Sequence, residues 1–530
     1  MCAMKSSVHQ RNIEEINKLD GYDFIIVCTS TPYQATYWQH RLMATRGSIS
    51  PLLSRVIAVH EDWNGAAGNG LGTLYAYTKA VIAGRELYDV DISQLLAQGS
   101  VSVALYHTAG KGTRLAPLPG SENNNKSGVK LPAMVKVGSH MLPMTILEAV
   151  IKQTGVYGAS RYGRLSVFWG DQVFIPSASV KYTPKHHIDI LAALAPMPTE
   201  REWKERGLDK YGLIAVNQKC QAAQVDKVTY DTATRLLSSL GELRSVGTSL
   251  GSFSVDADML FALLNEFEPE LRSKNGNLDS DPHFWMPITL TLSAYVEVMR
   301  QKGMDVDESK SHYARIEKML NEFKKTTSRK DYGLFGCVDV GSDVYWWDYG
   351  QLKLYLKNNC LVTKIGVEAD CLRSFLGINE CIEQSQLGLR TEIDHSAILN
   401  CQISSGVIKN SVLSTVVARE VNAEGSILIN VTAHSIQARR CVVYNVTSAE
   451  AEGLILSEGT VLVGVLLPSG EKVVMQSNLE VCGGKAWKDT LEVNQHSFEA
   501  IYELNAHANV LELEELLQNE HLKLRNLVLA

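Results

Sequence analysis

The segment 103-VALYHTAGKGTRLAPLP-119 decides the fold, because in it an apolar strand runs directly into a glycine-rich turn. A largely apolar strand is typical of a parallel sheet that is covered on both faces. The turn consists of Ala109, Gly110, Lys111, Gly112 and Thr113. Its glycines let successive backbone N–H groups approach the oxygens of an anion, and Arg114 adds a planar, permanently charged cation. The segment therefore predicts an α/β protein with a phosphate-binding loop at the end of a strand.

Apolar runs alternate with helical patterns on both sides of this segment. Strand-like runs occupy residues 24–29, 55–60 and 164–169, and helical patterns occupy residues 33–45 and 144–153. Such alternation predicts βαβ units and a mixed, mostly parallel, Rossmann-like sheet. We expect residues 1–100 to form the N-terminal part of one domain and residues 101–365 to form its core.

The spacing of apolar residues changes near residue 390. Aliphatic residues then recur every four to six positions, with small or polar residues between them, as in 400-NCQISSGVIKNSVLS-414. This is similar to the short-period repeat of a parallel (left-handed) β-helix, which we expect over residues 366–496. A β-rich domain of short strands is the alternative. Residues 497–530 have a helical pattern and could cap an open end of the β-helix.

Composition indicates an ordinary globular protein. The 530 residues are 45% hydrophobic and 21% charged, and the net charge of −7 argues against nucleic acid as a partner. The N-terminus has no apolar core of a signal peptide, and no run reaches the ~18–20 apolar residues of a membrane span. The ten cysteines form no C-x-x-C pair. We therefore expect a cytoplasmic protein with reduced thiols that does not bind membranes.

The string Gly-x-Gly-Thr-Arg-Leu after a strand resembles the signature loop of the sugar-1-phosphate nucleotidyltransferases. In that family a lysine follows the loop, and Lys130 stands in this place. The segment 120-GSENNNK-126 lengthens the loop between the glycine-rich turn and Lys130, so that Lys126 is a rival candidate for the lysine of the family. Val129 stands where a proline usually precedes that lysine. The resemblance implies that residues 109–113 bind the nucleotide and that Arg114 and Lys130 contact the departing pyrophosphate.

Two aspartates lie in contexts that are similar to the metal-binding segments of this family. In 165-LSVFWGDQVFIP-176 an apolar strand ends at Asp171, and 343-DVYWWDYGQLKLYLKNN-359 contains Asp348 in a Trp-x-Asp-x-Gly pattern. The resemblance implies that both carboxylates bind a catalytic Mg²⁺, an ion that prefers oxygen ligands. A turn or helix-cap role for Asp171 and a helix N-cap role for Asp348 are the alternatives.

Weaker likenesses concern the sugar phosphate. Tyr211-Gly212 and Gly251 resemble the glycine positions of the family's sugar pocket, and Lys227, in Asp226-Lys227-Val228, resembles a lysine that holds the sugar phosphate. An ordinary structural role is the alternative for Gly212, Gly251 and Lys227.

The N-terminal region resembles fucose-1-phosphate guanylyltransferases. These proteins also begin with a strand and carry a Gly-Asn-Gly-x-x-Thr-Leu loop, seen here as 68-GNGLGTL-74. The resemblance implies that Gly70 and Gly72 contact the nucleotide, whereas a tight turn that opens a helix is the structural alternative. GTP with fucose 1-phosphate is the expected substrate pair, and UTP with glucose 1-phosphate is its rival.

The implied reaction is an in-line attack of a sugar-phosphate oxygen on the α-phosphorus, with Lys227 on the sugar phosphate and pyrophosphate leaving. A phosphate oxygen is already anionic, so that catalysis requires only positioning and charge neutralisation. The C-terminal repeats also suggest a hexapeptide-repeat acyltransferase with His395 or His434 at its surface, and a third reading is a catalytically silent regulatory subunit. The expected β-helix is a candidate surface for homo-oligomer contacts.

Overall fold

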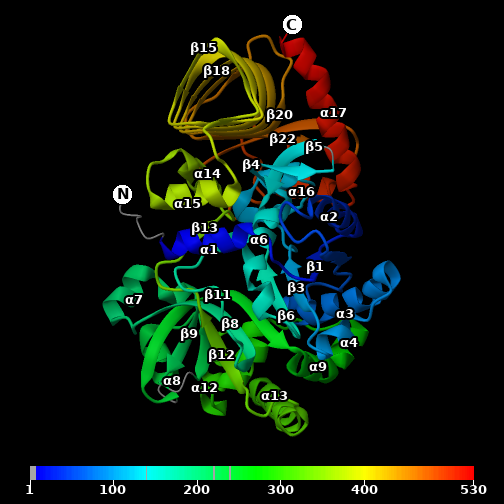
Figure 1. The fold of residues 1–530 in the computed structure, drawn as a ribbon, viewed down its shortest axis with the longest axis vertical. Coiled ribbons are helices and arrows are strands. Elements are labelled where there is room, and N and C mark those ends of the chain that lie inside the picture. Colours follow the sequence, from blue (N-terminus) through cyan, green and yellow to red (C-terminus); the bar gives the residue numbers. More distant parts are fainter. Residues whose placement is uncertain (1–6, 139, 219–220, 238–239, 530) are drawn as a thin grey trace.

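A computed structural model describes residues 7–138, 140–218, 221–237 and 240–529. The protein is α/β, with mixed sheets that are rich in parallel strands. In Figure 1 the main sheet and its helices occupy the lower part of the molecule, a stack of strands occupies the upper part, and the C-terminal helix runs beside the stack.

One half of the main sheet is parallel. It contains β1 (Phe24–Thr29), β2 (Arg55–His60), β3 (Ser102–His107) and β6 (Arg164–Trp169), in the order β2-β1-β3-β6. Every residue of β1 and β3 is buried, which explains why both strands are predominantly apolar. Since the strands are parallel, their carboxyl ends lie along one edge of the sheet, and the glycine-rich turn follows β3 at this edge.

The other half of the sheet is largely antiparallel. It contains β8 (His186–Ala195), β9 (Gly212–Asn217), β10 (Ala222–Asp226), β11 (Leu243–Asp256) and β12 (Gly333–Asp339). The long strand β11 pairs antiparallel with β6, β8 and β9, and its register shifts between Ser249 and Phe253. This irregularity lets β11 pass from β9 to β6. The sheet is therefore mixed, and its parallel part lies on the side of the glycine-rich turn.

Helices cover both faces of the sheet and form two apolar cores with it. One core holds β1 to β3 against α3 and α9, and the other packs α1, α2 and α6 between the sheet and the strand stack. The helices of this region are α1 (Val8–Asn17), α2 (Pro32–Thr45), α3 (Gly68–Tyr88), α4 (Ile92–Ala97), α5 (Leu118–Ser121), α6 (Ile146–Thr154), α7 (Glu200–Arg206), α8 (Tyr230–Leu237), α9 (Ala257–Glu266), α10 (Glu268–Ser273), α11 (Met286–Thr289), α12 (Leu292–Gln301), α13 (Val306–Thr326), α14 (Leu352–Cys360) and α15 (Val367–Leu376). Two short antiparallel pairs join the strands β4 (Lys130–Val137) and β5 (His140–Thr145), and β7 (Gln172–Ile175) and β13 (Tyr345–Asp348).

The C-terminal region is a stack of mainly parallel strands. Its strands are β14 (Ile382–Glu383), β15 (Gln386–Asp394), β16 (Ala397–Leu399), β17 (Gln402–Lys409), β18 (Val412–Glu424), β19 (Ile427–Arg439), β20 (Val442–Thr447), β21 (Leu454–Ile455), β22 (Thr460–Leu466) and β23 (Lys472–Asn478). Ala397, Val412, Ile427 and Val442 are successive partners. Each turn of chain therefore lies on the previous one, and equivalent positions recur at intervals of 15 residues.

The turns of this stack are held by left-handed residues and by a serine ladder. Asn400, Thr415, Asn430 and Asn445 all have positive φ values at the same corner. The buried hydroxyl of Ser411 accepts from the Ser426 N–H group at 3.1 Å and donates to Lys409 O at 2.8 Å. Ser396 and Ser426 make equivalent contacts one turn away on either side. The ladder satisfies backbone groups that would otherwise be buried without a partner.

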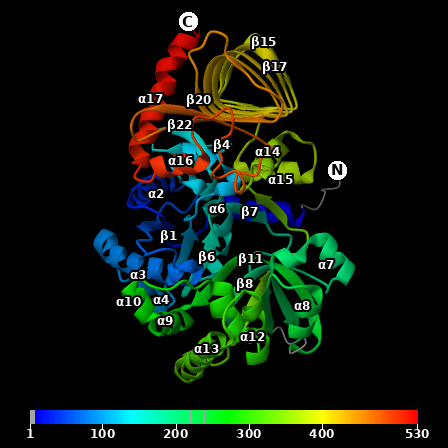
Figure 2. The same ribbon diagram turned by 180° about the vertical axis from the view of Figure 1, so that it is seen from behind.

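The C-terminal segment contains α16 (Phe498–Leu504) and α17 (Val510–Leu529), in agreement with its helical pattern. The segment does not cap an end of the stack. Instead, α17 crosses successive strands along the side of the stack (Figures 1 and 2). Arg525 donates to Gln402 of β17, Arg419 of β18 donates to Val528 O, and His521 contacts Thr432 of β19.

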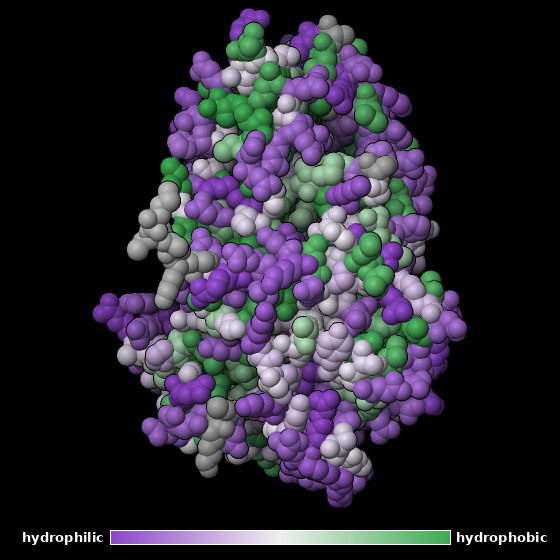
Figure 3. Space-filling model, in the orientation of Figure 1, coloured by the Kyte–Doolittle hydropathy of each residue, from purple (hydrophilic) through white to green (hydrophobic). Residues whose placement is uncertain are grey.

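Hydrophilic residues cover most of the face shown in Figure 3. Within the described residues, no helix has both the length and the apolar character that a membrane span requires. The cysteines of this part are free, and only Cys381 and Cys482 are exposed. Cys2 and Cys220 lie outside the described residues.

The serine ladder is open to a direct test. Ser411→Ala removes an acceptor and a donor from a fully buried position, and we expect a loss of about 1–3 kcal/mol in stability. Urea denaturation followed by circular dichroism measures the loss. Ser404→Ala, at an exposed position in β17, is the matched control and should change stability by less than about 0.5 kcal/mol. Equal stability of the two variants would contradict a structural role for the ladder.

Candidate functional site

The two aspartates converge although they lie far apart in the sequence. Asp171 follows β6, and Asp348 ends β13, which pairs antiparallel with β7 so that Asp348 is opposite Gln172. A Cβ atom built on Gly350 would lie 3.0 Å from Asp348 Oδ1, 3.4 Å from Asp171 Oδ2 and 3.8 Å from Arg114 Nη2. The absence of a side chain at Gly350 thus leaves a space that two carboxylates and one guanidinium border.

The glycine-rich turn adopts a backbone that its glycines permit. Gly110 has φ +122° and Gly112 has φ +64°, in the region that side chains disfavour. Residues Thr113–Leu115 then form a short 3₁₀ turn. Gly112 also packs against Lys126, whose Cγ would lie 3.0 Å from a Cβ atom built on the glycine. The lengthened loop therefore folds back onto the turn.

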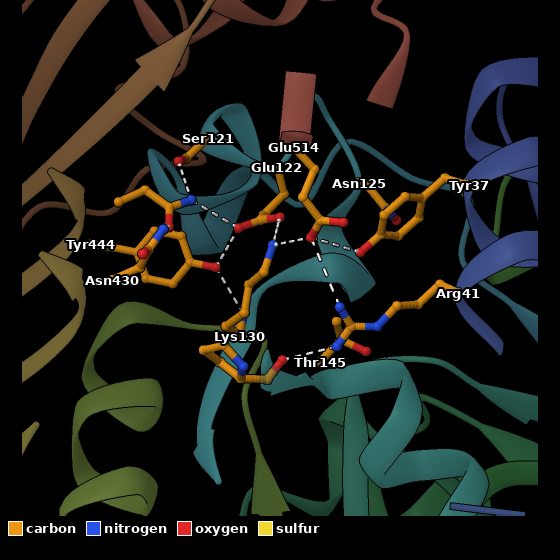
Figure 4. Close-up of polar contacts among 12 residues, drawn as sticks. Tyr37, Arg41, Ser121, Glu122, Asn125, Lys130, Thr145, Asn430, Tyr444 and Glu514 are labelled. Carbon is orange, nitrogen blue, oxygen red and sulfur yellow. Dashed lines mark hydrogen bonds and ion pairs between the residues drawn. The ribbon is translucent and has the colours of Figure 1, made fainter. Parts of the chain in front are cut away.

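The structure separates the roles of the two rival lysines. Lys126 forms an ion pair with Asp171, so that its ammonium group lies at the site. Lys130 is buried between Glu122 and Glu514, with its Nζ atom 3.2 Å from Glu514 Oε1 (Figure 4). Of the two lysines, only Lys126 places its ammonium group at the site, because that of Lys130 has two carboxylate partners in the interior.

The network around Lys130 joins distant parts of the chain. Tyr444 of β20 donates to Glu122 and accepts from the Lys130 N–H group at 2.8 Å, while Tyr37 of α2 donates to Glu514 of α17 at 3.3 Å (Figure 4). Burial lowers the pKa of Lys130, but attraction to Glu122 and Glu514 outweighs it, and the net shift is upward. Lys130 therefore stays charged and acts as a structural ion.

The residues assigned to the sugar phosphate lie at a second polar region. Gly212 begins β9, and a Cβ atom built on it would lie 3.5 Å from Asp281 Oδ2 and 3.6 Å from Asp226 Oδ1. Both aspartates, together with Lys227 and Lys302, line an open cavity of about 590 Å³. Lys302 pairs with Asp226 at 2.7 Å. Burial raises the pKa of Asp281 to about 6. Acidic and basic side chains thus lie together around this cavity.

Gly251 of β11 packs against Trp169, the last residue of β6. Its φ is +73°, and a Cβ atom on it would lie 2.4 Å from Trp169 Nε1, so that only glycine fits. Trp169 stacks on His107, with ring centroids 5.3 Å apart. His107 contacts Thr73 Oγ1 at 2.8 Å, and burial lowers the pKa of the histidine to about 4. The imidazole is therefore neutral at neutral pH.

Residues 68–74 do not form the expected loop but begin α3, and the two glycines Gly70 and Gly72 have different surroundings. A Cβ atom built on Gly72 would lie 3.1 Å from Glu61 Oε2 and 3.7 Å from His107 Cε1, at the ends of β2 and β3. Gly70 instead packs against the backbone of Leu278, where a Cβ atom would lie 2.7 Å from the carbonyl oxygen. A close approach of two backbones explains Gly70, whereas Gly72 faces polar groups at the sheet edge.

Sequence reasoning missed several residues of this region. Gly350 stands in the quoted Trp-x-Asp-x-Gly pattern, which was a usable signal. Glu61 and His107 stand at strand ends, but nothing in their spacing distinguishes them. The C-terminal residues Gly483 and Gly484 also reach the glycine-rich turn, where Gly484 lies beside Thr113 and Arg114. Their position depends on the whole fold.

No protein-family model matches this chain, and a search of curated proteins finds no significant relative. Among the described residues, no group of three or more His, Cys, Asp or Glu is arranged to hold a metal ion. The candidate site therefore rests on its own geometry, in which two carboxylates and two cations surround one space beside a glycine-rich turn.

The structural role of Lys130 predicts a large effect on stability. Lys130→Met leaves Glu122 buried without its cation and leaves Glu514 with only the more distant Arg41, and we expect it to cost about 3–5 kcal/mol, as measured by urea denaturation. The control is Lys353→Met, which removes an exposed ion pair with Glu480 and should cost less than about 1 kcal/mol. A Lys130→Met protein of unchanged stability would show that the buried pair is dispensable.

Proposed function

We propose that this chain is a sugar-1-phosphate nucleotidyltransferase, which condenses a nucleoside triphosphate with a sugar 1-phosphate and releases pyrophosphate. The single observation that carries the proposal is the convergence of Asp171, Asp348 and Arg114 around Gly350, beside a glycine-rich turn at the end of β3. Polyanionic substrates require such a combination of backbone donors, cations and carboxylates.

The proposal includes a finer reading of the fold. The parallel strands β1, β2, β3 and β6, with helices on both faces, support a Rossmann-like nucleotide-binding core. The regular interval between stacked strands supports a parallel β-helix in the C-terminal region. In a doubly wound sheet, ligands bind outside the carboxyl ends of the strands, which is where Gly110, Asp171 and Gly251 stand.

Each group has a role in the proposed reaction. Arg114 and Lys126 neutralise the departing pyrophosphate, and the N–H groups of residues 109–113 hold its oxygens. Lys227 and the polar cavity beside Gly212 hold the sugar phosphate. Because the attacking phosphate oxygen is already an anion, the chain needs to supply orientation and charge rather than a general base.

Mg²⁺ fits the residues that are present. Asp171 and Asp348 offer carboxylate oxygens around one space, the ammonium group of Lys126 is already attracted to this point, and Gly350 leaves the room that a side chain would fill. Two protein carboxylates with substrate phosphates are a usual ligand set for this ion. When bound, the ion supplies charge neutralisation between the two phosphate groups.

The site residues are tested by substitution. We expect Asp171→Asn and Arg114→Ala each to reduce turnover by ~10²-fold or more, because each removes an electrostatic group from the reacting centre. Magnesium-dependent pyrophosphate release, with circular dichroism as a check of folding, measures the effect. Asp343→Asn changes an exposed carboxylate in the same segment and should leave turnover intact. Near-normal turnover of either site variant would count against the assignment.

The substrate pair is tested by a matrix of nucleoside triphosphates against sugar 1-phosphates, with pyrophosphate as the readout. We expect the highest rate with GTP and fucose 1-phosphate, on the basis of the N-terminal loop. A faster rate with UTP and glucose 1-phosphate would reassign the substrates but keep the reaction. The absence of pyrophosphate release from every pair would overturn the proposed activity.

A further inference from the structure

The C-terminal segment of residues 482–502 lies directly against the glycine-rich turn. A Cβ atom built on Gly483 would lie 2.4 Å from Thr113 O and 3.2 Å from Ala116 Cβ. A Cβ atom on Gly484 would lie 3.4 Å from Thr113 Oγ1. The approach to Thr113 is so close that residue 483 has to be glycine. The chain thus returns from the strand stack to cover the loop that the proposed function assigns to phosphate.

The lengthened loop between Gly120 and Lys126 holds this segment in place. Asn124 Nδ2 donates to Tyr502 O at 2.7 Å, and Asn505 Nδ2 donates to Gly120 O at 2.8 Å. Ile501 packs on Gly120, whose built Cβ atom would lie 2.9 Å from Ile501 Cγ2. The insertion that separates the turn from Lys130 in the sequence is therefore the dock for the C-terminal segment.

Two aromatic rings of this segment face Lys111, the residue between the two glycines of the turn. Lys111 Nζ lies 5.1 Å from the centroid of the Tyr502 ring and 5.9 Å from that of the Trp487 ring. The two rings meet edge to face, with centroids 5.8 Å apart. Within the described residues, Lys111 forms no ion pair with a carboxylate. A cation–π contact holds a lysine without neutralising its charge.

We infer that Trp487 and Tyr502 are positioning residues that hold the ammonium group of Lys111 for the polyphosphate, so that the C-terminal segment completes the phosphate site. This inference rests on the proposed function. Lys126 is paired with Asp171, and Arg114 borders the carboxylates, whereas the Lys111 charge is left for an anion. The flanking glycines Gly110 and Gly112 have no side chains that could support Lys111, so that the rings of the C-terminal segment are the contact that holds its ammonium group.

Binding of pyrophosphate with Mg²⁺ to the full-length chain, measured by calorimetry, tests the inference. We expect Trp487→Leu to raise the Kd for pyrophosphate roughly fivefold, the scale of one cation–π contact, and Trp487→Phe to restore most of the affinity. The KM for pyrophosphate in the reverse reaction should rise similarly, with a smaller change in kcat. Tyr332→Leu, which removes a ring beside Arg329 elsewhere, should leave the Kd unchanged.

A double-mutant cycle separates positioning from general packing. Lys111 is exposed, so that the Lys111→Met variant should fold normally. Adding Trp487→Leu to this variant should not weaken pyrophosphate binding further, because the two residues act through one charge. A wild-type Kd in the Trp487→Leu variant, or fully additive losses, would overturn the inference while the proposed function stands. If the wild-type chain binds neither pyrophosphate nor a nucleoside triphosphate, the proposed function fails and takes this inference with it.

Discussion

The buried ion network around Lys130 is the contact on which the assembly of this chain depends. Its members come from α2, the lengthened loop, β4, β20 and α17, which together represent almost every region of the chain. An ion in the interior is tolerated only when its charge is matched and its hydrogen bonds are satisfied. Attraction to Lys130 and Arg41 outweighs burial and lowers the pKa of Glu514, so that the C-terminal helix brings a charged carboxylate into the network.

The buried network also positions one residue of the candidate site. The loop that carries Glu122 also carries Lys126, and Lys126 reaches Asp171. The buried pair therefore fixes one end of the loop, while the other end presents a lysine to the space beside Gly350. The carboxylates are fixed separately, by the pairing of β7 with β13, which places Asp348 opposite Gln172. The site forms where these two constraints meet.

Local patterns in the sequence predicted the parts of the structure that local chemistry determines. The apolar runs of β1, β3 and β6 and the glycines of the turn have a direct signature, since burial on both faces and positive φ values restrict the residue types. The convergence of Asp171 and Asp348 was expected from resemblance, and the structure brings these residues together.

Other features could not be predicted because they depend on distant contacts. Nothing in the sequence near Lys130 indicates that Glu514 is its partner, and the spacing of aliphatic residues gave only an approximate period for the strand stack. The serines at positions 396, 411 and 426 carry the regular interval, but each is an ordinary residue until its neighbours are known. The docking of residues 482–502 likewise depends on the insertion at residues 120–126.

The lysines of this region differ in how far their partners are buried. Lys130 has its carboxylate partners, Glu122 and Glu514, in the interior. If a ligand drew Lys130 away from them, a buried charge would be left unpaired, at a cost of several kcal/mol. The Lys126–Asp171 pair is about one-fifth exposed on each side, and the cation–π contact of Lys111 lies at the surface. Water and ions therefore reach these contacts, in contrast to the buried pairs of Lys130. A polyanion with its counter-ion can therefore take the place of Asp171 beside Lys126 and can bind Lys111 while the two rings stay in contact with it, but it cannot replace the partners of Lys130. The same lysine chemistry thus serves the fold where it is buried and remains available to a ligand where it is exposed.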